Sequence, residues 1–128
     1  MNNVNKTKYK IYMPLVKLQS EKETGNIEYK IRLCNDTEEK INQLGTQMLY
    51  RLYQGEGYVI YYLGVCDNGD IMGIFENDLD ISFSLLKRVS KKIGAELIKF
   101  IKINIDGTDK FYMKVILKKK LDLSLIDL

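Results

Sequence analysis

Acidic side chains are the residues of this sequence that could support catalysis, because the chain contains no histidine. Carboxyl groups act as general acid and base when two of them face each other and an apolar pocket raises the pKa of one. Glu76, Asp78 and Asp80 lie close together, but they begin a predicted helix, where negative charge is favoured in any case. Asp67 and Asp70 flank a predicted turn. We therefore expect no catalytic role for these residues.

Nucleotide-binding and metal-binding motifs are absent from the sequence as well. It contains no G-x-x-x-x-G-K-[ST] loop, whose backbone amides bind phosphates. Residues 5–8, NKTK, lack the carboxylate of a guanine-reading motif, since Lys8 occupies that place. Cys34 and Cys66 have no partner at metal-ligand spacing, and we interpret them as buried free thiols. We expect no enzymatic activity, no cofactor and no metal.

Aromatic residues and glycines indicate a binding surface instead, on a predicted hairpin over residues 57–75. Asn68-Gly69 is a strong two-residue turn signal, and with these residues at the tip Tyr62 pairs with Phe75. One face of the hairpin is then aliphatic and suits the helices: it carries Val59, Tyr61, Leu63, Val65, Met72 and Ile74. The other face, which we expect to be open, carries Tyr58, Ile60, Tyr62, Gly64, Cys66, Ile71, Gly73 and Phe75.

Hydrophobic periodicity predicts the elements that position this hairpin. Residues 27–33 alternate with period two, which is typical of a strand and places Tyr29 on one face. Residues 35–55 and 76–94 have apolar stripes at helical spacing. Strands are predicted at 95–106 and 110–120, joined by a turn at Asp106-Gly107.

Helix ends and one internal glycine are also predicted from local signals. Asp36 with Glu39 fits a capping box, and Asn77 or Asp78 is expected to cap the second helix. Gly55 and Gly94 are expected to close the two helices in the left-handed conformation. The internal Gly45 predicts close contact with a neighbouring element.

The order of elements predicts an α+β fold. It reads strand, helix, strand, strand, helix, strand, with an extra strand at each end, as in a ferredoxin-like split βαβ (βαββαβ) antiparallel sheet with two helices on one face. We divide the chain into an N-terminal arm, 1–26, with an edge strand near 8–13, a single α+β domain, 27–120, and a tail, 121–128.

Composition favours a soluble protein of one domain. The chain has 128 residues and a net charge of +3, and it lacks an apolar run long enough for a membrane span. No secretory signal precedes the domain. We expect a cytoplasmic location, which for a viral sequence means the host cytoplasm or the virion.

Two surfaces could contact RNA. An open sheet face with Tyr29, Tyr58, Tyr62 and Phe75 is similar to the base-stacking surface of RNA-recognition modules, and Gly64 and Gly73 would leave a notch for a flat ring. The sequence signature of those modules is missing, so we favour the alternative that the extra strands, the tail, a neighbouring domain or a second copy covers this face. The outer side of the second helix is basic, although such charges are ordinary on a solvated helix: it carries Lys87, Arg88, Lys91 and Lys92.

Three stretches of the sequence resemble the N-terminal region of the GTP-binding protein 1 and 2 family, which are translational GTPases related to elongation factor 1A. They are GNIEYKIRL, TQMLYRLYQGEGYVIYYLGVCDNGDIMG and LLKRVSKKIGAE, within about residues 13–103. The matching positions are Gly25, Asn26, Glu28, Tyr29, Lys30, Thr46, Gln47, Met48, Arg51, Leu52, Gly55, Gly57, Tyr61, Gly64, Val65, Asp67, Gly69, Gly73, Ser82, Leu86, Gly94 and Ala95.

The sequence also departs from that family. Tyr50 stands where a tryptophan is usual, and Tyr58-Val59 stands where a Glu-Ala pair is usual. The phosphate loop that follows in the family has no counterpart here. The resemblance therefore implies either a part of such a GTPase or a free-standing copy of its leading domain, and in both cases we expect these residues not to bind or hydrolyse GTP themselves.

Three functions remain open from the sequence. The first is an interaction domain that contacts the translation or RNA-handling machinery or a GTPase domain, through the open hairpin face and, as a second choice, through Gln47 and Arg51 on the outer side of the first helix. The second is a structural protein that forms a homodimer. The third is an RNA-binding module that uses the open sheet face.

Overall fold

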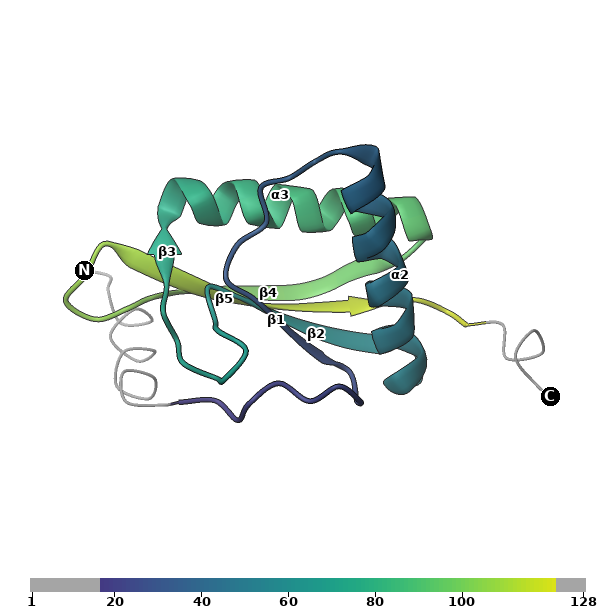
Figure 1. Ribbon diagram of the computed structural model, residues 1–128, viewed down its shortest axis with the longest axis horizontal. Helices are drawn as coiled ribbons and strands as arrows, with labels where there is room; N and C mark the ends of the chain where they lie inside the picture. Colours follow the sequence, from purple (N-terminus) through teal and green to yellow (C-terminus); the bar gives the residue numbers. More distant parts are fainter. Residues whose placement is uncertain (1–16, 122–128) are drawn as a thin grey trace.

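The computed structural model describes residues 17–121 and shows two helices on one face of a five-stranded sheet (Figure 1). The edge strand predicted near residues 8–13, and the tail from residue 122 on, lie outside the described residues. The elements are β1 (Ile27–Lys30), α2 (Glu38–Gln54), β2 (Tyr58–Leu63), β3 (Ile74–Phe75), α3 (Glu76–Ile93), β4 (Glu96–Asn104) and β5 (Lys110–Lys118).

The last strand, β5, lies at the centre of the sheet. Met113 of β5 pairs with Lys102 of β4 on one side and with Leu63 of β2 on the other. Beyond β2 lies β1, which runs parallel to it and pairs Ile27 with Ile60. The sheet is therefore mixed. The strand predicted as a C-terminal addition is the one that joins β2, β3 and β4.

The prediction of one long hairpin over residues 57–75 is wrong. Tyr62 pairs with Lys114 rather than with Phe75, and Phe75 pairs with Lys110. β2 and β3 therefore follow each other along the same edge of β5, and residues 64–73 form a short excursion between them. The turn at Asn68-Gly69 does exist, since the Gly69 amide donates to the Cys66 carbonyl at 2.8 Å. It organises only this excursion.

The α+β class and the covering of one sheet face by the helices are confirmed. Alternate residues of β2 and β5 point into the core beneath α2 and α3. The burial of their apolar side chains stabilises the packing of the helices on the sheet. The predicted aliphatic face is right except at Met72, which is exposed, and at Val65, which belongs to a second cluster on the opposite face. The buried core consists of Leu33, Ile41, Leu44, Met48, Leu52, Val59, Tyr61, Leu63, Ile74, Leu79, Leu85, Leu86, Val89, Met113, Val115 and Leu117.

The helices begin at other caps than predicted. Thr37, not Asp36, caps α2, and its hydroxyl accepts a hydrogen bond from the Lys40 amide at 3.2 Å. Phe75 precedes α3 without a side-chain cap, so Asn77 and Asp78 lie inside the first turn. Neither helix within residues 17–121 is long and apolar enough to cross a membrane.

Glycines account for the helix ends and for the helix–helix contact. Gly94 adopts the left-handed conformation that we predicted. Gly55 does not, with φ −101°, but a Cβ there would lie 2.0 Å from the Tyr58 carbonyl oxygen, so close backbone approach requires glycine. At Gly45 a Cβ would lie 3.1 Å from Cγ2 of Ile93, which confirms close contact between α2 and α3.

Candidate interaction surface

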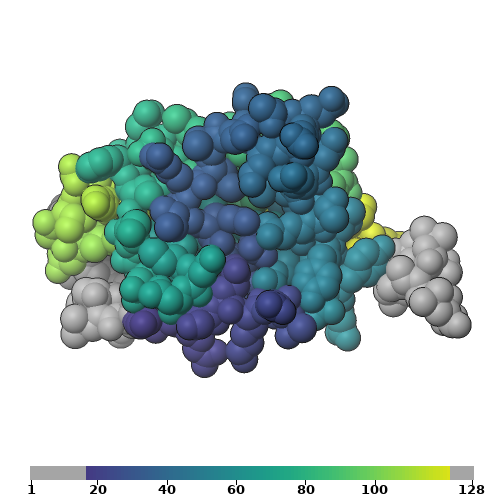
Figure 2. All heavy atoms as spheres, viewed as in Figure 1, coloured from purple at the N-terminus to yellow at the C-terminus, as the bar shows by residue number. Residues whose placement is uncertain are grey.

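Residues 17–26, which we call the strap, run along the sheet on the side away from the helices (Figure 1). The Leu18 amide donates to the Gly69 carbonyl at 3.0 Å, and the Glu21 amide donates to the Asp67 carbonyl at 2.6 Å. Figure 2 shows the purple strap beside the teal excursion along the lower edge of the molecule. The strap and the Asn68-Gly69 turn therefore hold each other against the sheet.

The strap covers one half of the sheet face that we expected to be open. Tyr29 is only 5% exposed, and its hydroxyl donates to the Gln19 carbonyl at 2.6 Å. Its ring meets that of Tyr62 edge-on, with centroids 5.7 Å apart. The cluster under the strap consists of Tyr29, Val65, Ile103 and Tyr112, with Leu18, Tyr62, Ile71, Ile101 and Ile105 against it.

The notch expected at Gly64 and Gly73 is filled. A Cβ on Gly73 would lie 2.3 Å from Cδ1 of Ile105, and one on Gly64 would lie 3.0 Å from the Phe111 carbonyl oxygen. Both glycines have positive φ, so they allow the chain to leave β2 and return to β3 beside β5. They serve the fold and leave no room for a ring.

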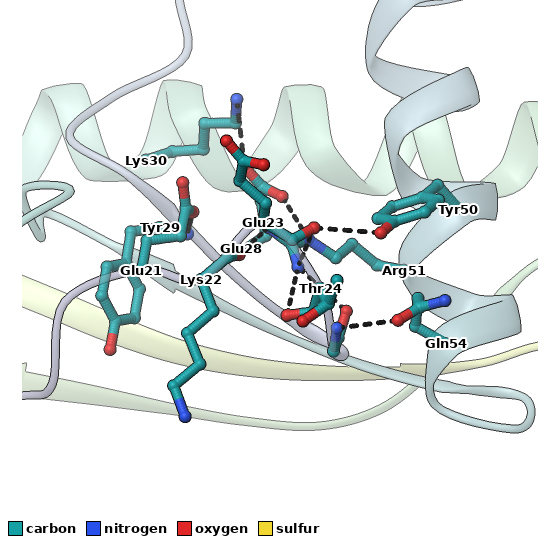
Figure 3. A network of polar contacts seen from close by, with 11 residues as sticks. Glu21, Lys22, Glu23, Thr24, Glu28, Tyr29, Lys30, Tyr50, Arg51 and Gln54 are labelled. Carbon is teal, nitrogen blue, oxygen red and sulfur yellow. Dashed lines mark hydrogen bonds and ion pairs between the residues drawn. The ribbon is translucent and has the colours of Figure 1, made fainter.

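Arg51 anchors the strap through a buried network (Figure 3). Its Nε donates to Oε1 of Glu28 at 2.7 Å, and both side chains are buried. Lys30 lies 3.5 Å from the other oxygen of Glu28. The remaining guanidinium groups donate to consecutive strap carbonyls at 2.7 to 3.3 Å, those of Lys22, Glu23, Thr24 and Gly25. One side chain of α2 thus satisfies a whole loop of backbone acceptors.

Neighbouring side chains of α2 complete this anchor. The Tyr50 hydroxyl donates to the Glu23 carbonyl at 3.0 Å, and Oε1 of Gln54 accepts from the Gly25 amide at 2.9 Å (Figure 3). Asn26 reaches the other way, to the Tyr58 carbonyl at 3.2 Å. The strap is therefore tied both to the end of α2 and to the start of β2.

The position predicted for Arg51 and Gln47 is wrong. Arg51 is buried instead of lying on the outer side of α2, and Gln47 is half-buried, with an Oε1 that has no hydrogen-bond partner. A sequence signal existed: Arg51 continues the inner stripe three residues after Met48. Glu28 lies opposite the core residue Tyr61, on the face of β1 that is turned toward the helices. A cation on the inner stripe of the helix and a carboxylate on the inner face of the strand together indicate a buried ion pair.

Burial raises the pKa of four groups around the strap, among them Tyr29, whose pKa the neighbouring Tyr62 and Glu21 raise further. Burial raises the pKa of Glu21 above its ordinary value, and the nearby carboxylates of Glu28 and Asp67 add to this, against the Tyr29 amide that bonds to Glu21. Burial also raises the pKa of Tyr61, and it raises that of Tyr112 to about 12. These phenols stay protonated at neutral pH, so the network can hold the strap but supplies no phenolate.

The other half of this sheet face is uncovered, and we call it the open half-face. Tyr58 is 47% exposed and lies opposite Lys118. The next row, across β1, β2, β5 and β4, is Ile27, Ile60, Ile116 and Lys99, and Ile27 is 39% exposed. The following row is Tyr29, Tyr62, Lys114 and Ile101, and the strap covers its Tyr29 end. We define the open half-face by these residues: Ile27, Tyr58, Ile60, Lys99, Lys114, Ile116 and Lys118.

Phe75 does not share a surface with Tyr58. Phe75 is 51% exposed, but it lies beside Lys110, with that Nζ 5.6 Å from the ring centroid, whereas Tyr58 lies beside Lys118. Eight residues of an antiparallel strand separate the two lysines by about 27 Å. Of the four aromatic residues predicted for this face, the structure leaves Tyr58 open, Tyr62 half-buried and Tyr29 covered, and Phe75 lies on the same side of the sheet but at its far end.

The basic residues predicted on the second helix lie on α3, on the helical side of the sheet. Arg88 forms an exposed ion pair with Asp36 at 3.6 Å, and Lys92 donates to Asn42 at 2.6 Å. Lys87 lies over the Phe83 ring at 4.6 Å, and Lys91 is exposed. The interpretation of both cysteines as buried is wrong, because Cys34 is exposed and Cys66 is half-buried.

Over most of its length this α+β chain is similar to part of a GTP-binding protein, although no protein-family model matches it. It is 41% identical over 80 residues to GTP-binding protein 2 of Mus musculus and to that of Homo sapiens, a stretch that is 62% of this chain and 13% of each relative. It is 31% identical over 103 residues to an uncharacterized protein of Acanthamoeba polyphaga mimivirus, covering 80% of this chain and 55% of that protein. The matched stretches thus span about an eighth of the GTP-binding protein 2 relatives and about half of the mimivirus protein.

Proposed function

We propose that this chain is a non-catalytic interaction domain, similar to the N-terminal domain of a translational GTPase, and that it presents the open half-face to the translation or RNA-handling machinery or to a GTPase domain. The similarity to GTP-binding protein 2 supports the relation to such a GTPase. That relative is much longer than the matched 80 residues, so GTP binding belongs in this proposal to other parts of such proteins.

The half-covered sheet is the observation that carries the proposal. The Arg51 network holds the strap firmly over the cluster around Tyr29, yet the strap leaves Tyr58 and Ile27 exposed on the same face. Exposed apolar side chains in adjacent rows of a sheet are typical of an interaction site. Two exposed large apolar side chains on the helices, Tyr53 and Ile81, lie outside this sheet face and provide a matched control.

Co-sedimentation with the ribosomal particles of a cell extract tests this proposal. We expect the wild-type chain and the control Tyr53→Ala/Ile81→Ser to enter the particle fractions, and Tyr58→Ala/Ile27→Ser to stay with free protein. All four residues are exposed, so both variants should fold. Absence of the wild-type chain from every particle fraction, or an equal loss in the control, would refute the proposed contact. Fluorescent GTP analogues should not bind the chain alone.

A further inference from the structure

We propose that the occupant of the open half-face is single-stranded RNA. This inference rests on the proposed function, which places the chain in contact with RNA-handling machinery, and it names the molecule that is bound. It follows from the way aromatic and basic side chains alternate on this face.

Each tyrosine of the open side of β2 has a lysine directly across on β5. Tyr58 pairs with Lys118, and Tyr62 pairs with Lys114, whose Nζ lies 5.9 Å from the Tyr62 ring centroid. Ile60 and Ile116 form an apolar row between these two pairs. Proteins that bind single strands combine rings on which bases stack with cations that follow the phosphates. Tyr58, the more exposed ring, is the stacking residue.

Charge on this face also favours a polyanion over a second copy of the chain. Lys99, Lys114 and Lys118 contribute three cations, and the carboxylate in the same rows is Glu96, opposite Lys118. In a symmetric dimer built on this face the same lysines would approach one another, which costs free energy. A nucleic acid would instead release counterions as the lysines bind phosphates.

The basic residues of α3 provide a charge-matched comparison. Lys87 and Lys91 are exposed like Lys118, but they lie on the helical side, with α3 and the sheet core between them and the open half-face. An effect that depends on total charge would not distinguish the two pairs of lysines. If RNA binds the proposed surface, then of these two pairs only the substitution of Lys114 and Lys118 should weaken binding.

Fluorescence anisotropy with a fluorescein-labelled, unstructured RNA oligonucleotide tests the inference. We expect Tyr58→Ala to weaken binding about 5- to 150-fold, which corresponds to one base stack of about 1–3 kcal/mol. Lys114→Gln/Lys118→Gln should reduce the slope of log affinity against log salt by about 1.4, that is, about 0.7 for each phosphate contact on a single strand. Lys87→Gln/Lys91→Gln should leave both affinity and slope unchanged.

Four results would overturn the inference: no anisotropy change with the wild-type chain, equal losses in the α3 variant, equal affinity for a duplex RNA or for DNA of the same sequence, or a Tyr58-dependent dimer in sedimentation equilibrium without RNA. The proposed function is tested separately. If RNA does not bind but Tyr58-dependent co-sedimentation persists after ribonuclease treatment of the extract, the interaction domain stands and its partner is a protein.

Discussion

The sheet face opposite the helices has two halves with different environments. In the covered half, Tyr29 is buried under the strap and its hydroxyl binds a strap carbonyl. In the open half, Tyr58 has a similar place on a neighbouring strand but is 47% exposed. The same residue type on one face therefore stabilises the fold at one position and remains free for contact at the other. The strap makes the difference.

Some of the positions that match the resembled family lie in the covered half, whereas Tyr58 in the open half does not match. Several of the matching positions, Gly25, Asn26, Glu28 and Arg51, belong to the network that holds the strap. Tyr58, in contrast, stands where the resembled family usually has a glutamate. The shared residues thus account for the covered half, and we expect the binding properties of the open half to be particular to this chain.

Removal of the Arg51 side chain, which anchors the strap over the covered half, should cause the largest loss of stability. Arg51→Met leaves the buried Glu28 with Lys30 as its remaining cation, and it leaves three strap carbonyls, those of Lys22, Thr24 and Gly25, without a donor, so we expect a loss of about 3–5 kcal/mol in the free energy of unfolding. Urea denaturation measures it. The control Arg88→Met removes only an exposed ion pair and should cost less than about 1 kcal/mol. Equal losses in the two variants would contradict the anchoring role of Arg51.

A methyl group at Gly69 should loosen the strap without touching the core. Gly69 has φ +94°, and a Cβ there would lie 2.0 Å from the Leu18 carbonyl oxygen, so the turn and the strap cannot both keep their positions. We expect Gly69→Ala to cost more than about 1 kcal/mol of stability. Amide hydrogen exchange should be faster at Leu18 and Glu21 and unchanged at Met113 in the centre of the sheet. Faster exchange at Met113 would instead indicate global destabilisation.

The titration of Glu21 should produce a smaller effect that depends on pH. Burial raises the pKa of Glu21 in the folded protein above its ordinary value of 4.5, so the folded state holds this proton more tightly than the unfolded chain. The resulting stabilisation is complete below the ordinary pKa and is lost as the pH rises through the raised one. Glu21→Gln stays neutral, so its unfolding free energy relative to wild type should improve from about pH 4 to about pH 7. A difference independent of pH would contradict the shift.

The open half should contribute least to stability. Tyr58→Ala removes an exposed ring that no strap residue covers, and we expect a change within about 0.5 kcal/mol of the wild-type unfolding free energy. Thermal and urea denaturation of this variant beside Tyr29→Ala, which should cost several times more, compare the two halves directly. A large loss at Tyr58 would show that this ring is structural as well.

Local patterns in the sequence were sufficient for most elements of the fold. The stripe of Ile41, Leu44 and Met48 predicts α2, and the alternation along residues 110–118 predicts β5, because periodicity depends on neighbours within one element. Pairing was not predictable in the same way. Asn68-Gly69 determines its own turn, but whether residues 58–63 pair with residues 71–75 depends on the competing strand about fifty residues away.

The candidate site was predicted only in part, for the same reason. Tyr58 and Tyr62 do lie on the face opposite the helices, as their alternation with Val59 and Tyr61 indicates. The covering of Tyr29 depends on the strap, a polar segment with no periodicity to place it. Helical spacing indicates the burial of Arg51, because this residue continues the apolar stripe. Its charge, however, favours the prediction of a solvent-exposed side chain.

The central position of β5 has a consequence for the way the protein is made. Residues 110–118 pair with three other strands, so on a translating ribosome β2 and β4 have no partner between them until this segment leaves the exit tunnel. Until then their edges and apolar sides are exposed to association with other chains. Folding of the sheet therefore waits until residue 118 has emerged, and truncation before residue 118 should yield an insoluble product.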